Sequence, residues 1–288
     1  MKQWKKYLPV YLILLLALLA TLFWYALLRE ERGGLLTVSF LDVGQGDAIF
    51  IEAPSGKQII IDGGPDTSLV RQLGSAMPFY DRTIDMLVVT NPDKDHFAGF
   101  IDALLRYRVG EIVEPGTQTA SAIYATFRER VADEGAQTFL PKTGDRIVLD
   151  EKRGITLDVL FPDRDVSGLD TNDGSLVTRL SYGEICFLLM GDAPRGVEEY
   201  LTHLYGDYLH CAVLKVGHHG SRTSSSEFFV QKVAPQYAVI SDGKDNSYGH
   251  PHQETLDTLK EFGVNVLRTD TLGTITFETD GVELWKRK

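Results

Sequence analysis

The stretch VVTNPDKDHFAGF, residues 88–100, sets two carboxylates and a histidine directly behind an apolar strand. Residues 84–90, IDMLVVT, have the apolar character of a buried strand, and Asp93, Asp95 and His96 follow in one short loop. Divalent cations of hard or borderline character bind carboxylate oxygens and imidazole nitrogens that the backbone holds in place. The stretch therefore predicts half of a metal site, and later parts of the chain have to supply the other half.

Two later loops follow apolar strands in the same way. Gly191 and Asp192 come after the strand at residues 184–190, and the loop GHHGS, residues 217–221, comes after the strand at 212–216. Each loop alone has an ordinary structural explanation, such as a solvated turn or a helix cap. Their joint order, each behind a strand, favours one shared metal centre.

Apolar runs bounded by turn residues predict strands, and amphipathic stretches predict helices. The predicted strands cover residues 36–41, 48–52, 58–61, 84–90, 155–161, 177–182, 184–190, 212–216, 238–240, 264–268 and 273–278. The predicted helices cover residues 67–76, 97–107, 120–134, 195–205, 225–233 and 254–262. Strands cluster at both ends and alternate with helices in between. This pattern predicts two sheets with helices on their outer faces, in one domain over residues 34–288.

Composition limits the possible functions. The chain has 288 residues, a formal net charge of −11 and 43% hydrophobic residues, which excludes a disordered chain, a collagen and a small disulfide-stapled module. The excess of acid argues against a broad nucleic-acid surface, because such surfaces usually carry basic residues over the phosphates. Any phosphate contact has to use local positive charge, which bound cations supply.

The first 33 residues differ from the rest of the chain because they contain a long apolar segment. Residues 8–28 carry no charge, and as a helix they span ~31 Å, close to the hydrocarbon thickness of a bilayer. Lys2, Lys5 and Lys6 precede them, which predicts a cytoplasmic N terminus and an extracellular or periplasmic domain. The stretch is longer than the apolar region of a signal peptide and lacks a small-residue cleavage site. A single-pass membrane anchor over residues 1–33 is therefore favoured, and secretion after signal cleavage is the alternative.

The two cysteines, Cys186 and Cys211, are too few for a cysteine-rich zinc site. They lie in or beside predicted strands at similar distances ahead of Asp192 and His218, so they can be neighbours. We predict buried free thiols.

These motifs, in this order, resemble the metallo-β-lactamase fold, and more narrowly the hydrolase domain of the ComEC/Rec2 DNA-uptake family. The segments that carry the resemblance are FLDVGQGDAIFI (40–51), IIIDGG (59–64), VVTNPDKDHFAGF (88–100), LLMGDA (188–193), LKVGHHGSRTSSS (214–226) and YGHPH (248–252). The resemblance implies an α+β fold, a four-layer αββα sandwich with a one- or two-metal site at one edge of its sheets. The multi-spanning channel region of the full uptake proteins has no match here, which favours a membrane-tethered hydrolase.

The resemblance also assigns metal ligands residue by residue. It gives Asp93 to the first metal and both Asp95 and His96 to the second. Asp192 is expected to bridge the two metals, and His218 to complete the second site. The expected cofactor is one or two divalent ions, Zn²⁺ or Mn²⁺.

The chain departs from the family pattern at Asn91, where that pattern has a histidine. A further histidine between this loop and Asp192 is also missing, and residues 172–175 occupy its place. An amide oxygen is a weak, neutral ligand, so Asn91 is a doubtful one. The first site is therefore expected to be poorer and to prefer Mn²⁺ or Mg²⁺ over Zn²⁺.

A hydrolytic mechanism follows from these assignments. A water held between the metals becomes the nucleophile, Asp95 or Asp192 accepts its proton, and His250 protonates the leaving oxygen. Lys215, Ser221 and Arg222 are expected to contact phosphate oxygens. Lys215 on a solvent-facing strand and Ser221 as a turn cap are the structural alternatives.

The surrounding polar residues receive supporting roles. Asp62, before two glycines, is expected to hydrogen-bond a ligand histidine and fix its tautomer, and His219 and His252 to lie behind the ligands or at the surface. The residues expected to shape the turn beneath the site are Asp42, Gln45 and Asp47. His203 and His210 are interpreted as structural.

Three functions fit these observations. The favoured hypothesis is a membrane-anchored, extracytoplasmic phosphodiesterase or nuclease, with DNA as one possible substrate. The second is a hydrolase of cell-wall phosphodiesters such as phosphorylcholine esters, or of another small ester, which suits an acidic domain. The third is a non-catalytic binding protein with a degraded metal site, suggested by Asn91.

Overall fold

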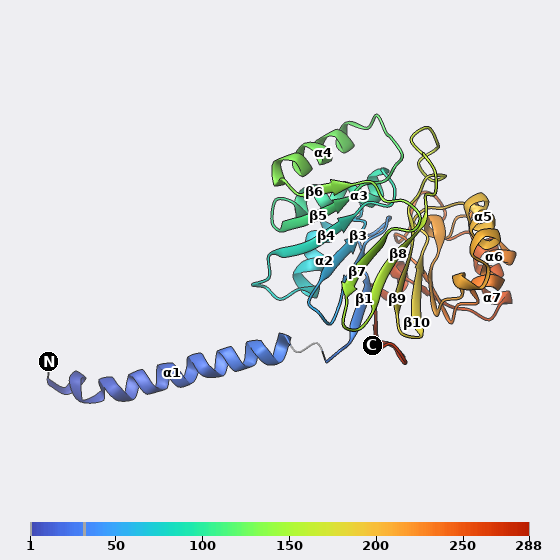
Figure 1. Cartoon of the computed structure of the whole chain (residues 1–288). Helices are drawn as coiled ribbons and strands as arrows, with labels where there is room; N and C mark the ends of the chain where they lie inside the picture. Colours follow the sequence, from blue (N-terminus) through green and yellow to red (C-terminus); the bar gives the residue numbers. More distant parts are fainter. Residues whose placement is uncertain (1, 31–32, 288) are drawn as a thin grey trace.

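Two β-sheets lie face to face in the computed structural model, and helices cover both outer faces (Figure 1). The structure describes residues 2–30 and 33–287, so Glu31 and Arg32, which follow the predicted span, lie outside the described residues. The first sheet has eight strands and the second has seven, and both mix parallel and antiparallel pairs. The predicted four-layer αββα sandwich is confirmed.

The first sheet runs, in spatial order, through β15 (Leu284–Lys286), β14 (Ile275–Thr279), β1 (Leu36–Phe40), β2 (Ile49–Glu52), β3 (Gln58–Ile61), β4 (Thr83–Val88), β5 (Arg108–Val113) and β6 (Gln137–Phe139). The second sheet runs through β13 (Asn265–Arg268), β12 (Tyr237–Ile240), β11 (Val213–Lys215), β10 (Ile185–Leu189), β9 (Val177–Tyr182), β8 (Ile155–Phe161) and β7 (Arg146–Asp150). The first sheet packs against α2 (Ser68–Ala76), α3 (Lys94–Ala103) and α4 (Ala122–Glu134). The second packs against α5 (Arg195–Tyr205), α6 (Glu227–Val233) and α7 (Gln253–Glu261), and the short segments are η1 (Gly206–Leu209), η2 (Gly217–Gly220) and α8 (Thr269–Leu272).

Strand residues alternate between two buried faces. In β2, Ile49 and Ile51 enter the core between the sheets, whereas Phe50 packs beneath the helices of the first sheet. In β3, Ile59 and Ile61 face inward and Ile60 faces the helices. Because successive side chains of a strand point to opposite faces, a sheet buried on both sides needs continuous apolar runs such as these.

Strand direction brings the polar loops together. Strands β3 and β4 are parallel, as are β10, β11 and β12. The loops after β4, β10, β11 and β12 therefore leave from the carboxyl ends of parallel strands, where ligand sites of such sheets form. We call this the site edge. At the opposite edge, where β1 begins, the Tyr182 hydroxyl donates a hydrogen bond to the carbonyl of Gly34.

Four strands escaped the sequence analysis, namely β5, β6, β7 and β15. Strands β6, β7 and β15 are short, lie at sheet edges and are largely exposed, so they lack the apolar alternation that identifies a strand. Helix α3 begins at Lys94, three residues before the predicted start at Phe97. Asp95 and His96 consequently lie in the first turn of a helix.

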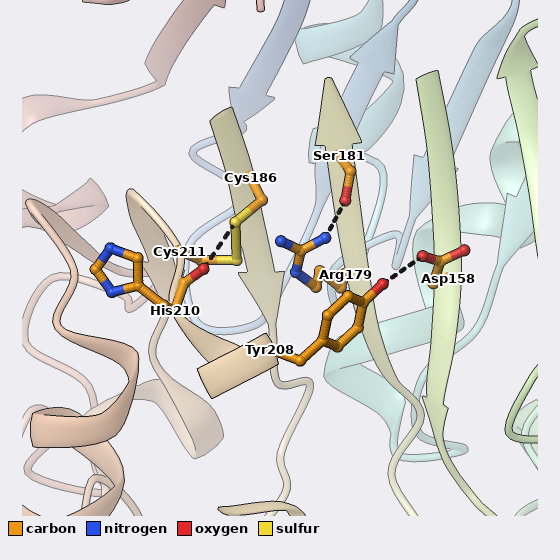
Figure 2. The surroundings of a disulfide bond; sticks show 7 residues. All are labelled: Asp158, Arg179, Ser181, Cys186, Tyr208, His210 and Cys211. Atoms are coloured by element: carbon orange, nitrogen blue, oxygen red, sulfur yellow. Dashed lines mark hydrogen bonds between the residues drawn. A yellow bond between two sulfur atoms is a disulfide. The ribbon is translucent and has the colours of Figure 1, made fainter. Parts of the chain in front are cut away.

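The prediction of free thiols is wrong, because Cys186 and Cys211 form a disulfide bond (Figure 2). Strands β10 and β11 are parallel neighbours with Phe187 opposite Val213, so the residues at their starts approach each other. The two Cα atoms lie 4.9 Å apart. Sequence spacing alone did not reveal this pairing of strands. The bond lies at the starts of the strands, away from the site edge.

The amino-terminal helix α1 (Lys2–Glu30) has 29 residues. Its segment Tyr7–Tyr25 has a mean hydropathy of 2.2 and is not buried against the rest of the protein. This helix is long and apolar enough to cross a membrane.

Replacing both cysteines, Cys186→Ser with Cys211→Ser, should lower the free energy of unfolding by about 3 kcal/mol, because the bond closes a loop of moderate length. The midpoint Tm should fall by roughly 6–12 °C. Metal content should not change, because the bond is remote from the site edge. Thermal denaturation of the variant and of the reduced parent protein measures this. Two reactive thiols in the denatured, unreduced parent would show that the bond does not form.

Candidate metal centre

Seven buried or half-buried polar side chains meet at the site edge and form what we call the acid–histidine cluster. Its members are Asp47, Asp62, Asp95, His96, Asp192, Lys215 and His219. They come from the segment between β1 and β2, the end of β3, the first turn of α3, the loop after β10, strand β11 and segment η2. The convergence of Asp95, His96 and Asp192, predicted from their positions behind strands, is found in the structure.

Asp62 orients His96. The Asp62 carboxylate lies 2.8 Å from His96 Nδ1 and accepts hydrogen bonds from the amide and hydroxyl of Thr90 at 2.8 and 2.6 Å. This leaves His96 Nε2 facing Asp192, whose Oδ2 is 3.1 Å away. The contact expected between Asp62 and a histidine of the site is therefore found at His96. The partner Thr90 was not identified from the sequence.

His219, not His218, points into the cluster. His219 Nδ1 donates to the carbonyl oxygen of Ser241 at 2.9 Å, and its Nε2 lies 3.3 Å from Asp95 Oδ2 and 3.6 Å from Asp192 Oδ2. His218 is half-buried, and its Nδ1 lies 3.1 Å from the hydroxyl of Thr223. The two roles expected for this histidine pair are thus exchanged.

Backbone conformation explains the exchange. His218 and His219 have φ values of 50° and 51°, a left-handed conformation that is uncommon outside glycine. Two such residues in succession turn the chain sharply within η2, and the sequence GHHGS does not indicate which ring points inward. A residue held in this conformation costs free energy, so the surrounding structure has to stabilise it.

Lys215 does not face substrate, contrary to expectation. Its side chain is buried, its ammonium group contacts the Asp47 carboxylate, and it donates to the Gly191 carbonyl oxygen at 2.9 Å. Asp47, expected only to shape a turn, lies 3.4 Å from His219 Nδ1 and 3.9 Å from His96 Nδ1. Lys215 is therefore the buried counter-ion of Asp47 within the cluster.

Burial and charge shift the pKa values of the cluster in opposite directions. Burial disfavours the charged form of Asp47, but Lys215 and His219 outweigh it and lower its pKa to about 2. Burial likewise disfavours the ionised Asp192, yet His96 and His219 hold its pKa well below the usual range. Burial lowers the pKa of His219, but Asp192 and Asp47 raise it to about 10. In the absence of a metal, protonated histidines therefore balance the negative charge of the carboxylates.

The cluster fits a divalent cation. Four of its buried atoms have no hydrogen-bond partner within the part of the chain that the structure describes, namely Asp47 Oδ1, His96 Nε2, Asp192 Oδ1 and His219 Nε2. Potential ligand atoms of Asp95, His96 and His219 lie within 4.8 Å of one another, as do those of Asp47, Asp192 and His219. His96 Nε2 and His219 Nε2 face carboxylate oxygens, so the cluster needs either protons on these histidines or a bound cation to balance its charge. Mixed oxygen and nitrogen ligands suit Zn²⁺ or Mn²⁺.

The residues expected at a first metal site bind one another instead. Asn91 is buried, its side-chain amide donates to Asn172 Oδ1 at 2.7 Å, and its own oxygen accepts the Asp93 amide at 3.0 Å. Asp93 accepts a hydrogen bond from the Thr171 hydroxyl at 3.1 Å. Within residues 2–30 and 33–287, Asp93 does not belong to a group of converging histidine, cysteine or carboxylate ligand atoms. The doubtful ligand Asn91 therefore has both ends of its amide engaged.

Further histidines and one arginine border the cluster on the solvent side. The His250 ring centroid lies 5.5 Å from that of His218, 6.2 Å from that of His219 and 5.0 Å from that of His252. Burial and the neighbouring imidazoles lower the pKa of His250 to about 4. Arg222 is exposed and bonded to His252 Nε2 at 3.0 Å. A neutral His250 is not the resting proton donor that the sequence led us to expect.

The remaining expected residues support the loops. Ser221 is buried and its hydroxyl accepts hydrogen bonds from Thr223, so it caps the turn. Gln45 accepts the amide of Gly243, and Asp42 accepts that of Gly44. The carbonyl oxygen of Ser241 accepts the hydrogen bond of His219. The sequence did not predict this contact, because any residue type can supply a backbone carbonyl. His203 lies outside the cluster and packs against Phe228.

The fold and these motifs define a protein class. The sequence profile of the Metallo-beta-lactamase superfamily matches residues 41–242, and the chain belongs to this superfamily. Most members of the superfamily are metal-dependent hydrolases.

Three curated proteins to which the chain is similar are named for competence or recombination. ComE operon protein 3 of Bacillus subtilis (strain 168) is 31% identical over 273 residues, 89% of this chain and 34% of that protein. Competence protein ComA of Neisseria gonorrhoeae is 30% identical over 244 residues, 83% of this chain and 32% of that protein. Recombination protein 2 of Haemophilus influenzae is 30% identical over 254 residues. The chain spans about a third of the length of these relatives.

A solved structure agrees in fold. CmlA, a diiron β-hydroxylase from Streptomyces venezuelae, matches with a TM-score of 0.54 and 14% identity, over 84% of this chain and 53% of CmlA. At this identity the likeness concerns the fold alone.

Stability of the metal-free protein should fall as pH rises. The pKa of His219 is raised from 6.5 to about 10. Protonation of His219 therefore contributes fully to the free energy of unfolding below about pH 6.5, and this contribution disappears as the pH approaches 10. One pKa unit corresponds to ~1.4 kcal/mol, so we expect a loss on the order of a few kcal/mol. Thermal denaturation with a chelator at several pH values measures it.

The His219→Gln variant is the matched control and should show a smaller alkaline loss, because only His96, whose pKa Asp192 and Asp62 also raise despite its burial, still contributes. With metal bound, the dependence should reverse, because protonation of ligand histidines at low pH competes with the cation. An alkaline loss of equal size in His219→Gln would contradict the assignment.

Proposed function

We propose that this protein is a membrane-anchored hydrolase of phosphodiesters that uses one divalent cation held by Asp95, His96, Asp192 and His219. The single observation that carries the proposal is the convergence of carboxylate and imidazole ligand atoms in the acid–histidine cluster, where those of Asp95, His96 and His219 lie within 4.8 Å of one another. Membership of a superfamily composed mostly of metal-dependent hydrolases supports it.

We propose one cation because the residues of the other site are already engaged. Asn91 and Asn172 are hydrogen-bonded to each other, and Asp93 is bonded to Thr171. Neutral amides compete poorly for a divalent cation with the carboxylates and imidazoles of the cluster. We keep Zn²⁺ or Mn²⁺ as the proposed ion.

Asp95 is the proposed general base. Its side chain is 29% exposed, whereas those of Asp47, Asp62 and Asp192 are almost wholly buried. His219 and His96 outweigh burial and lower the pKa of Asp95, so it is ionised at neutral pH. A cation held by these residues would lower the pKa of a water molecule and offset charge on phosphoryl oxygens. Asp95 can then accept the proton of an attacking water from the solvent side, and Asp192 helps to hold the cation.

The groups at the solvent side suit an anionic substrate. Arg222 is exposed and its guanidinium can donate two hydrogen bonds to phosphate oxygens. The neutral His250 can hydrogen-bond the substrate or accept a proton, and we propose this in place of proton donation. The names of the relatives concern competence and recombination. We therefore propose single-stranded DNA as the first macromolecular substrate to test.

We propose that residues 1–33 form a cytoplasmic stub and membrane anchor and that residues 34–288 form the hydrolase domain outside the cytoplasm. The lysines at positions 2, 5 and 6 favour this orientation. The disulfide between Cys186 and Cys211 supports it independently, because such bonds persist mainly in oxidising compartments.

The purified chain, supplied with Mn²⁺ or Zn²⁺, should hydrolyse bis-p-nitrophenyl phosphate and single-stranded DNA. Asp95→Asn should lower kcat by roughly 100-fold or more, because it removes a general base and also one proposed ligand of the cation, so the metal content of the variant is measured in parallel. His203→Gln, a histidine change outside the cluster, should leave kcat unchanged.

The alternatives give different results in the same assay. Hydrolysis of p-nitrophenyl phosphorylcholine without cleavage of DNA would indicate a small-ester hydrolase. Stoichiometric metal with no hydrolysis of any of these substrates would contradict the proposed activity and indicate a binding protein.

Elemental analysis should find one cation per chain, and Asn91→His combined with Asn172→His should raise this number to two. The double change restores imidazoles at the two positions where the structure has an amide pair. The matched control, Asn91→Ala with Asn172→Ala, should still bind one. Two cations in the parent protein would contradict single-metal binding.

A further inference from the structure

The edge opposite the metal centre lies close to the end of α1 in the sequence. Helix α1 ends at Glu30 and β1 begins at Leu36, and six residues reach at most ~21 Å. Because β1, β3 and β4 run in the same direction, their starts share one edge of the first sheet. The loop before β4 and the loop before β5 therefore belong to the edge from which the chain leads to α1.

Exposed apolar side chains gather in these two loops. Phe79 is 85% exposed and Tyr80 is 50% exposed, and their ring centroids lie 5.4 Å apart. Leu105, just before β5, is 59% exposed. A water-soluble surface gains nothing from such side chains, and aromatic residues are enriched where proteins meet the membrane interface.

Two arginines accompany them. Arg108 donates its backbone amide to the carbonyl oxygen of Arg82 at 2.8 Å, so the two residues are neighbours at the starts of β5 and β4. Together with Tyr80, Asp81 and Thr83 they line a hollow of about 530 Å³. The guanidinium of Arg82 lies 5.7 Å from the ring centroid of Tyr107.

These arginines are available to an outside anion. Among the residues that the structure describes, neither has a carboxylate within 4.0 Å. The nearby carboxylate of Asp81 accepts hydrogen bonds from Thr83 and Gln58. Within the described part of the chain, the two guanidinium groups are thus free of ion pairs although Asp81 lines the same hollow.

We propose that Phe79, Tyr80, Arg82, Leu105 and Arg108, here called the aromatic–arginine patch, contact the anionic headgroups of the bilayer that holds α1. The inference rests on the proposed membrane anchor. Aromatic rings suit the interfacial layer, and guanidinium groups pair with lipid phosphates. With the patch on the membrane, the acid–histidine cluster at the opposite edge faces away from the bilayer, toward substrates in solution.

The test uses the full chain in nanodiscs of phosphatidylcholine with phosphatidylglycerol. Because both native cysteines are bonded, Tyr80→Cys provides one thiol for a fluorescent label. A lipid that carries a TEMPO spin label on its headgroup should quench the fluorescence of this label. Leu140→Cys is the matched control, since Leu140 is 66% exposed and follows β6 at the site edge, and its label should not be quenched.

Reversing charge on the patch, Arg82→Glu with Arg108→Glu, should weaken membrane contact by roughly tenfold and reduce quenching. Arg128→Glu with Arg164→Glu changes charge equally at two exposed arginines elsewhere and should have no effect. Nanodiscs of phosphatidylcholine alone should give weaker quenching.

The experiment distinguishes failure of the proposed membrane anchor from failure of the proposed patch. Elution of the chain without lipid overturns the membrane anchor, and the proposed patch with it. A chain that remains in the nanodisc with an unquenched label at position 80, or with quenching unaffected by charge reversal, overturns the patch alone.

Discussion

Charge balance among buried carboxylates is the constraint on which the site edge depends. Asp47, Asp62 and Asp192 are almost wholly removed from water, and isolated buried carboxylates are strongly destabilising. Lys215 and the imidazoles of His96 and His219 provide the compensating positive charge in the metal-free protein. A divalent cation offers the same compensation without protons on the histidines, which is why the cluster is suited to bind one.

The fold provides this arrangement through strand direction. Loops that leave the ends of β4, β10, β11 and β12 come from both sheets, yet they meet at one edge of the sandwich. Backbone groups complete the positioning, since the Ser241 carbonyl holds His219 and the Thr90 amide holds Asp62. A rigid sandwich therefore presents the ligands, while the exposed Arg222 and the half-buried His250 remain at the solvent side.

The layered fold and most of the cluster could be predicted from the sequence, because apolar strands and the polar residues behind them leave clear patterns. Asp95, His96 and Asp192 were found in this way. The sequence does not reveal side-chain direction, so His218 was chosen over His219, and Lys215 was expected at the substrate. Edge strands such as β6 and the pairing of Cys186 with Cys211 depend on contacts between distant segments, which local patterns do not encode.

The central claim is that one divalent cation binds within the acid–histidine cluster. The most direct measurement is a crystal structure of the Mn²⁺-soaked protein with anomalous diffraction data. The account predicts one anomalous peak, bounded by His96 Nε2, His219 Nε2 and the carboxylates of Asp95 and Asp192. A peak beside Asn91 and Asn172, or no peak among the four ligands in crystals that contain Mn²⁺, would contradict it.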